Sequence, residues 1–122
     1  MYENTQHNCC QSVFCRYSEK YGISHDDAFR IGAFFNAGMR QGDVCGAISG
    51  ALMAMGMEYC DEDWHNNKKS LEFIKAFKAQ YGTIKCAELT KKCGRRDCPV
   101  YIKFSQDYLD KELPKRVEDC VH

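Results

Sequence analysis

Apolar residues recur at three- and four-residue spacing along much of the chain, which is the pattern of amphipathic helices. The first such helix ends at Gly22, a common stop residue, and its inner face holds Cys10, Val13, Phe14, Tyr17 and Tyr21. A second helix starts at the capping pair Ser24 and Asp27. Its apolar positions are Ala28, Ile31, Phe35 and Met39.

Four further helical segments follow. A third helix begins at the N-cap residue Asp43 and runs through an apolar, glycine-containing stretch to residue 56. A fourth helix ends at Gly82, with an inner face of Leu71, Ile74, Phe77 and Tyr81. A short turn of helix begins near Cys86. The last helix follows Pro99, carries Tyr101, Phe104 and Tyr108 on one face, and ends at Pro114.

Hardly any stretch alternates between apolar and polar residues, so the pattern predicts no sheet. We therefore expect an all-α fold, a single compact bundle of five to six helices in which residues 1–122 form one cysteine-rich domain. A chain of 122 residues can bury such a core without disulfides or metal. The core is expected to be built from Phe35, Leu52, Ile74, Phe77 and Phe104.

Charge and hydropathy exclude several classes of partner. Lys and Arg total 17 and Asp and Glu total 17, so the field that draws a protein to nucleic acid is missing. The longest apolar run, residues 47–57, is too short to cross a bilayer, which takes about 20 residues. The first ten residues have neither a basic start nor an apolar signal core. We expect no nucleic acid or membrane partner and a cytoplasmic location.

Nine cysteines are a large number for a protein of the reducing cytoplasm. Their odd count and the absence of an export signal argue against a framework of structural disulfides. Any one of them, taken singly, is as often a small buried apolar residue as a functional one. Together they favour thiol chemistry or metal binding.

Cys45 is the first candidate for such chemistry. With Asp43 as N-cap, Cys45 lies in the first turn of a helix, where free N–H groups and the helix dipole stabilise a thiolate. Gly46 and Gly50 leave one helix face bare, so a backbone, a cofactor or a second cysteine can approach it. A tight seam between helices would explain the same glycines. Cys86 and Cys98 also stand at helix boundaries.

Zinc-finger and histidine sites receive little support. The spacing of Cys86, Cys93 and Cys98 lacks the paired C-x2-C knuckles of common zinc sites. The four histidines do not fall at recognised ligand spacings, and we predict that each is a surface residue. They are His7, His25, His65 and His122.

Four stretches of the chain carry a family resemblance. They are NCCQSV at 8–13, GDVCGAISGALMAMG at 42–56, FKAQYGTIKCAEL at 77–89 and CPVYIKFSQDYL at 98–109. In this order they resemble the C-GCAxxG-C-C family of redox-active proteins, over nearly the whole chain. The resemblance places the family's four cysteines on Cys9, Cys45, Cys86 and Cys98. Cys10, beside Cys9, and Cys93, near Cys98, could instead take the first and last of these roles. Cys15, Cys60 and Cys120 are additional.

The family is similar to the cysteine-bearing domain of split-Soret cytochromes, which implies a helical fold able to hold an iron–sulfur centre. No C-x2-C-H haem attachment sequence occurs in this chain, so covalent haem is not implied.

Two main hypotheses for the activity stay open. In the first, the four cysteines ligate an iron–sulfur cluster, most plausibly 2Fe–2S, beside Gly46 and Gly50, and the protein carries electrons. In the second, the same cysteines form reversible disulfides in a thiol oxidoreductase or sensor, with Cys45 as a nucleophile of low pKa. A third reading is a thiol-rich protein that binds zinc or another soft metal. Whether the chain is an enzyme stays open. We expect a homodimer, since the helix at 43–56 could pack across a two-fold axis, and an unidentified redox partner.

Overall fold

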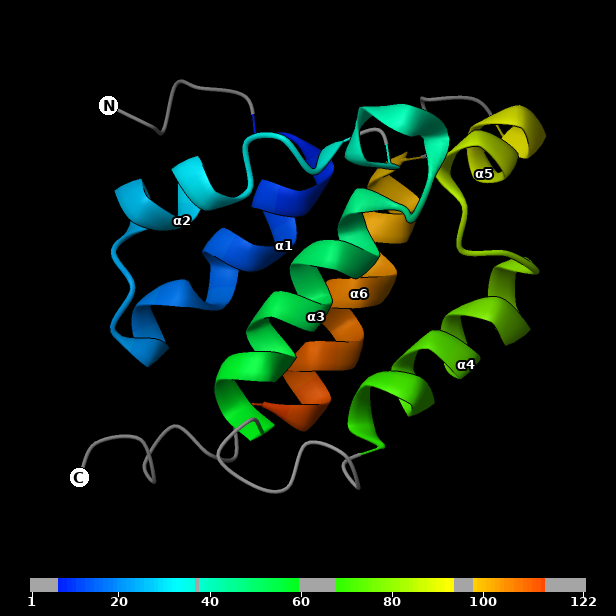
Figure 1. Cartoon of the computed structure of the whole chain (residues 1–122). Coiled ribbons are helices and arrows are strands. Elements are labelled where there is room, and N and C mark those ends of the chain that lie inside the picture. The colour runs from blue at the N-terminus through cyan, green and yellow to red at the C-terminus, as the bar shows by residue number, and fades with distance from the viewer. Residues whose placement is uncertain (1–6, 37, 60–67, 94–97, 114–122) are drawn as a thin grey trace.

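The computed structural model describes residues 7–36, 38–59, 68–93 and 98–113, with the side chains of residues 92, 93 and 98 outside that description (Figure 1). In these ranges the chain forms six α-helices and no strand, which confirms the all-α prediction. They are α1 (Cys9–Tyr17), α2 (His25–Ile31), α3 (Gly46–Tyr59), α4 (Lys69–Tyr81), α5 (Cys86–Cys93) and α6 (Cys98–Glu112). A 3-10 turn, η2 (Ser18–Tyr21), extends α1 to Gly22, and a further turn, η3 (Gly38–Gly42), precedes α3.

Helix α3 runs through the middle of the molecule (Figure 1). Helices α1 and α2 lie on one side of it, α4 lies on the other, and α6 packs behind it. The buried positions of α3 are mostly small, and they include Gly46, Ala47, Gly50, Ala51 and Ala54. Small side chains let the neighbouring helices approach closely, so α3 is the element around which the others pack.

Aromatic rings fill the space between α4 and α6. Phe73 lies against Tyr108 with ring centroids 4.9 Å apart, and Phe77 lies against Phe104 at 5.5 Å. Phe73 and Phe77 are fully buried. Leu71, by contrast, is 62% exposed, so its predicted inward position was wrong and Phe73 takes that place. The buried face of α4 is centred on residues 73 and 77, and Leu71 lies beyond its edge.

The predicted core is confirmed at most of its positions. Phe77 belongs to the buried cluster, and Leu52, Ile74 and Phe104 pack against it while partly exposed. Phe35 is half-buried and, among the described residues, lies outside this cluster. Phe35 lies outside the buried cluster because the chain leaves the helical path after α2.

The second helix is shorter than its apolar spacing predicts. It ends at Ile31 with Gly32 as C-cap, whereas a helix continuing to Met39 was expected. Met39 has a φ of 59°, in the left-handed region that interrupts a right-handed helix. Gly38 also has a positive φ and lies so close to Asp43 that a Cβ there would meet the Asp43 carbonyl oxygen at 2.5 Å. The chain therefore folds back tightly before α3 and leaves Phe34 71% exposed.

The bounds of the other helices follow their stop signals. Gly22 and Gly82 both adopt left-handed cap conformations, as predicted. Helix α6 ends at Glu112, while the predicted terminator Pro114 lies outside the described residues. No helix in the described ranges is long and apolar enough to cross a membrane.

An ion pair and a hydrogen bond join α1 to α6. The Arg16 guanidinium pairs with the Asp110 carboxylate at 2.9 Å, and the Tyr17 hydroxyl donates to the same carboxylate at 2.7 Å. The hydrogen bond from Arg16 is the main reason why the pKa of Asp110 lies below its ordinary value. Burial, followed by the bond to Asp110, raises the pKa of Tyr17.

Candidate functional site

The crossing of α1 over α3 uses both of the glycines singled out in the sequence. A Cβ on Gly46 would overlap the sulfur of Cys9 and would lie 3.0 Å from the Phe35 carbonyl oxygen. A Cβ on Gly50 would lie 2.5 Å from the Cys10 carbonyl oxygen. A second cysteine therefore approaches α3 at Gly46, and a backbone approaches it at Gly50.

A short antiparallel bridge holds the segments that precede α3 and α5 together. The Cys45 N–H donates to the Ile84 carbonyl at 2.8 Å, and the Cys86 N–H donates to the Asp43 carbonyl at 2.6 Å. Val44 and Lys85 form the central pair of this bridge. Cys45 and Cys86 thus occupy diagonal positions on one face of the bridge, where side chains can interact.

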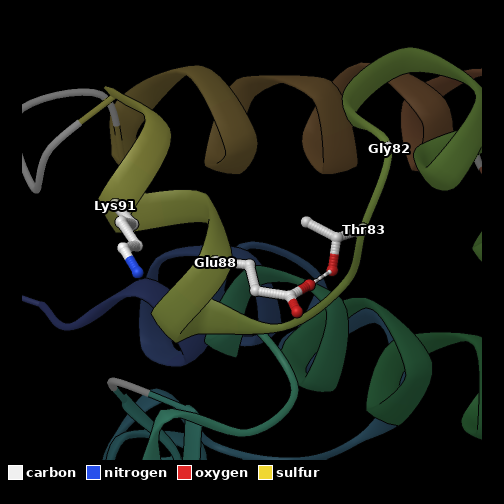
Figure 2. A pocket seen from close by; sticks show the side chains of 4 residues that line it. All are labelled: Gly82, Thr83, Glu88 and Lys91. Atoms are coloured by element: carbon white, nitrogen blue, oxygen red, sulfur yellow. Dashed lines mark hydrogen bonds between the residues drawn. The ribbon is translucent and has the colours of Figure 1, made fainter.

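The loop before Cys86 is fixed by side-chain hydrogen bonds. Figure 2 shows the Thr83 hydroxyl donating to the Glu88 carboxylate across the start of α5. The same hydroxyl accepts the Lys85 N–H at 3.2 Å. The Lys85 carbonyl accepts the Leu89 N–H at 2.9 Å, so Lys85 caps α5 and Cys86 is its first residue. These contacts position Cys86 at the bridge.

Cys45 itself is the residue just before α3. Its carbonyl accepts the N–H groups of Ile48 and Ser49, so the helix begins at Gly46, two residues later than an Asp43 cap would place it. Burial raises the pKa of the Cys45 thiol to about 12. Hydrogen bonds from the backbone of Ala47 and Ile48 lower this pKa, and the neighbouring Cys9 and Cys86 raise it. The predicted low-pKa nucleophile is therefore wrong, because burial outweighs the helix terminus.

Three of the four cysteines of the predicted site are thereby brought together. Cys9 reaches the start of α3, Cys45 stands at that start, and Cys86 is joined to it by the bridge. Cys98 is the first residue of α6, and its side chain lies outside the described part of the structure. The side chain of Cys93 lies outside it as well, as do Cys60 and Cys120 entirely.

Cys10 points elsewhere. It is fully buried, its Sγ lies 3.9 Å from the Sδ of Met53, and it packs beside Gly32. Burial, together with the neighbours Cys9 and Cys15, raises the pKa of the Cys10 thiol to about 12. Cys10 therefore serves the core between α1 and α3, while Cys9 faces the candidate site.

One cluster of potential ligands has no counterpart among the residues predicted from the sequence. His7 and His25, predicted as separate surface residues, are both half-buried, and their Nε2 atoms lie 3.1 Å apart. With the Sγ of Cys15 they form a group whose ligand atoms all lie within 4.8 Å of one another. No spacing in the sequence signals this cluster, because its members come from the segment before α1, the last turn of α1 and the start of α2.

The thiols of the main site are more widely spread than this group. Within the described ranges, Cys9, Cys45 and Cys86 do not form a set of ligand atoms within 4.8 Å of one another. They still act on one another electrostatically, since Cys9 and Cys86 both raise the pKa of Cys45.

Comparison with known proteins gives one match. The family model described as "Putative redox-active protein (C_GCAxxG_C_C)" matches residues 7–113, a range that includes all four cysteines of the predicted site. Searches of curated proteins and of solved structures gave no match. The chain belongs to the cysteine-rich C_GCAxxG_C_C family.

Proposed function

We propose that this protein carries electrons on a 2Fe–2S centre ligated by Cys9, Cys45, Cys86 and Cys98. The observation that carries the proposal is the gathering of three thiols around the start of α3, where Cys9 and Cys86 both oppose the ionisation of Cys45. The first three ligands would come from the first residue of α1, the residue just before α3 and the first residue of α5, and the fourth from the first residue of α6.

The electrostatics of the three thiols support a bound cation. Burial and the two neighbouring cysteines make a Cys45 thiolate unfavourable in the protein alone. Iron or another thiophilic cation reverses this balance, because a coordinating thiol is deprotonated by the positive charge of its metal. The donor set also fits, since thiolates are the usual ligands of iron–sulfur centres.

The spread of the thiols favours a cluster over a single zinc ion. Four thiolates around one tetrahedral zinc, with Zn–S bonds of about 2.3 Å, stand only about 3.8 Å apart. Cys9, Cys45 and Cys86 are less tightly gathered than that, whereas a 2Fe–2S centre divides its four ligands between two irons.

A disulfide between Cys45 and Cys86 fits less well. Diagonal neighbours on an antiparallel pair lie about 7–8 Å apart. A disulfide needs Cα atoms within about 6.8 Å. Closing this bond would require movement of segments that two backbone hydrogen bonds hold in place.

An iron–sulfur centre, when bound, supplies one-electron transfer at a potential that the protein adjusts. The residues of this chain would make that adjustment. The backbone N–H groups of Ala47 and Ile48 favour a negative charge on the Cys45 sulfur, and backbone N–H groups near ligand sulfurs are among the determinants of the potential. Burial of Cys45 keeps water away from that side of the site.

The test is anaerobic purification followed by an optical spectrum and analysis for iron, sulfide and zinc. The proposal predicts visible absorption with two irons and two sulfides for each chain. Cys45→Ser should abolish the absorption while the helical circular dichroism is retained. Two single variants serve as controls in which the iron–sulfur absorption should be unchanged. They are Cys10→Ser, at a buried position between α1 and α3, and Cys120→Ser.

Other outcomes would overturn the proposal. A colourless protein whose thiols titrate reversibly in pairs would identify a disulfide enzyme. A colourless protein holding one zinc through Cys45 would identify a structural metal site. A coloured protein in which Cys45→Ser leaves the spectrum unchanged would place the centre elsewhere.

A further inference from the structure

The cluster of His7, Cys15 and His25 is formed by the segment before α1, the last turn of α1 and the start of α2, apart from the thiols that face α3. Its three ligand atoms come within 4.8 Å of one another, a grouping found nowhere else among the described residues. The geometry points to a second metal site here, and we propose that it binds Zn²⁺ through His7, His25 and Cys15, with the fourth position open to water.

The distances suit a tetrahedral ion. Two imidazole nitrogens bound to one Zn²⁺ at about 2.0–2.1 Å stand about 3.3 Å apart, and a nitrogen and a thiolate stand about 3.6 Å apart. The Nε2 atoms of His7 and His25 are 3.1 Å apart, which is close to the first of these values. An ion can therefore replace the hydrogen bond between the rings with little movement of either histidine.

The imidazoles are held in place by a neighbouring aromatic ring. Phe29 packs edge-on against His7, with ring centroids 5.2 Å apart, and it stacks against His25 at 6.3 Å. His25 is the first residue of α2, which Ser24 caps by accepting the Asp27 N–H. Cys15 lies on the last turn of α1. Two of the ligands are thus fixed by helices, and His7, just before α1, packs against the same ring as His25.

The groove around the three ligands would let a metal ion enter and would leave its fourth coordination position open to water. The three ligands line an open groove whose other polar side chains include Gln11, Arg16 and Gln106. The Gln11 amide donates to the Phe29 carbonyl at 2.7 Å and accepts the Asn8 N–H, while the Gln106 amide donates to the Ser12 carbonyl. Arg16 is turned to Asp110, which offsets its charge near a cation.

The donor set indicates the ion. Imidazole and thiolate are the ligands of borderline-soft ions, and three protein ligands with an open fourth position are the arrangement of reactive rather than closed structural zinc sites. The thiolate of Cys15 would offset one of the two positive charges of Zn²⁺, and the bound water would face the groove.

The experiment uses the full chain carrying Cys45→Ser, so that the proposed iron–sulfur centre does not contribute to the signal. Metal-free protein is titrated anaerobically with Co²⁺, which reports thiolate ligation by its absorption, and Zn²⁺ is then added in competition. We expect one equivalent of Co²⁺ to develop a thiolate absorption band that Zn²⁺ abolishes.

Three variants in this background assign the ligands. Cys15→Ser should remove the thiolate band, and His7→Ala or His25→Ala should each weaken binding by at least about 100-fold, because loss of a ligand exceeds the 10- to 100-fold effect of an outer-shell partner. His7 precedes α1, so its replacement leaves every helix intact. Cys10→Ser, in the core of α1, is the matched control and should bind Co²⁺ unchanged.

Two results would overturn this second site. One is the absence of any thiolate band at millimolar Co²⁺, and the other is a band that survives Cys15→Ser, which would assign the ion to cysteines elsewhere. Neither result depends on whether Cys45 ligates an iron–sulfur centre, so failure here is distinct from failure of the proposed function.

Discussion

Replacement of Gly50 by alanine tests how closely α1 approaches α3. A Cβ at this position would lie 2.5 Å from the Cys10 carbonyl oxygen and 3.2 Å from the Phe14 nitrogen, both of them backbone atoms of α1. A rotamer change cannot relieve this clash, so α1 must move, and we take the upper end of the usual overpacking cost, about 3 kcal/mol. Alanine regains about 1 kcal/mol of helix propensity. The net loss of stability is therefore about 2 kcal/mol.

The assay is urea and thermal unfolding followed by circular dichroism, with Gly56→Ala as the control. Gly56 is also on α3, and a Cβ there would meet nothing within 4 Å, so this variant should gain about 1 kcal/mol. For a chain of 122 residues, 1 kcal/mol corresponds to about 4 °C in Tm. Gly50→Ala should melt about 8 °C lower and Gly56→Ala about 4 °C higher. Equal stabilisation of both variants would refute the close crossing.

Three further predictions concern the site, the core and the pH dependence. Gly46→Ala should displace the Cys9 sulfur and reduce the iron bound per chain, measured by metal analysis, because a Cβ would overlap that sulfur. Phe73→Ala should cost about 3–5 kcal/mol in urea unfolding and Leu71→Ala less than about 0.5 kcal/mol, since only Phe73 is fully buried. The lowered pKa of Asp110 means that its ion pair stabilises the fold above the ordinary carboxyl pKa and is lost as the pH falls through the lowered value. Asp110→Asn should cost less than about 1 kcal/mol near neutral pH, because the pair is partly exposed, and nothing in strong acid, as a series of melting curves against pH would show.

Much of the fold could be predicted from local signals. Gly22 and Gly82 end their helices because each adopts a left-handed conformation that only glycine takes without strain, and this requirement is visible in the sequence. The apolar periodicity located α1, α4 and α6, since each buries one face, whereas α3 was predicted from its apolar, glycine-containing run.

The errors came from contacts between distant segments. The stripe through Ile31 and Met39 has helical spacing, but the chain must turn back after α2 to reach the start of α3. On α4, Leu71 and Phe73 are equally apolar, and the rings of α6 decide which of them is buried.

The candidate site was predicted in part. The resemblance to a family named Cys9, Cys45 and Cys86, and the helix-end positions of Cys45 and Cys86 were visible in the sequence. The pairing of residues 43–45 with 84–86 was not, because a bridge of two hydrogen bonds leaves no strand pattern. The burial that raises the pKa of Cys45 was likewise a property of the assembled helices.

The bridge between Val44 and Lys85 also bears on how a centre would be loaded. Bringing together two residues separated by roughly 40 others costs a flexible chain about 3 kcal/mol of entropy. Here two backbone hydrogen bonds, rather than bonds to a metal, hold the two segments together. Zinc fingers, by contrast, fold only as their metal arrives. The proposed centre would therefore take two of its ligands from segments that the backbone already joins, and its assembly would be a local event at the start of α3 rather than the step that folds the protein.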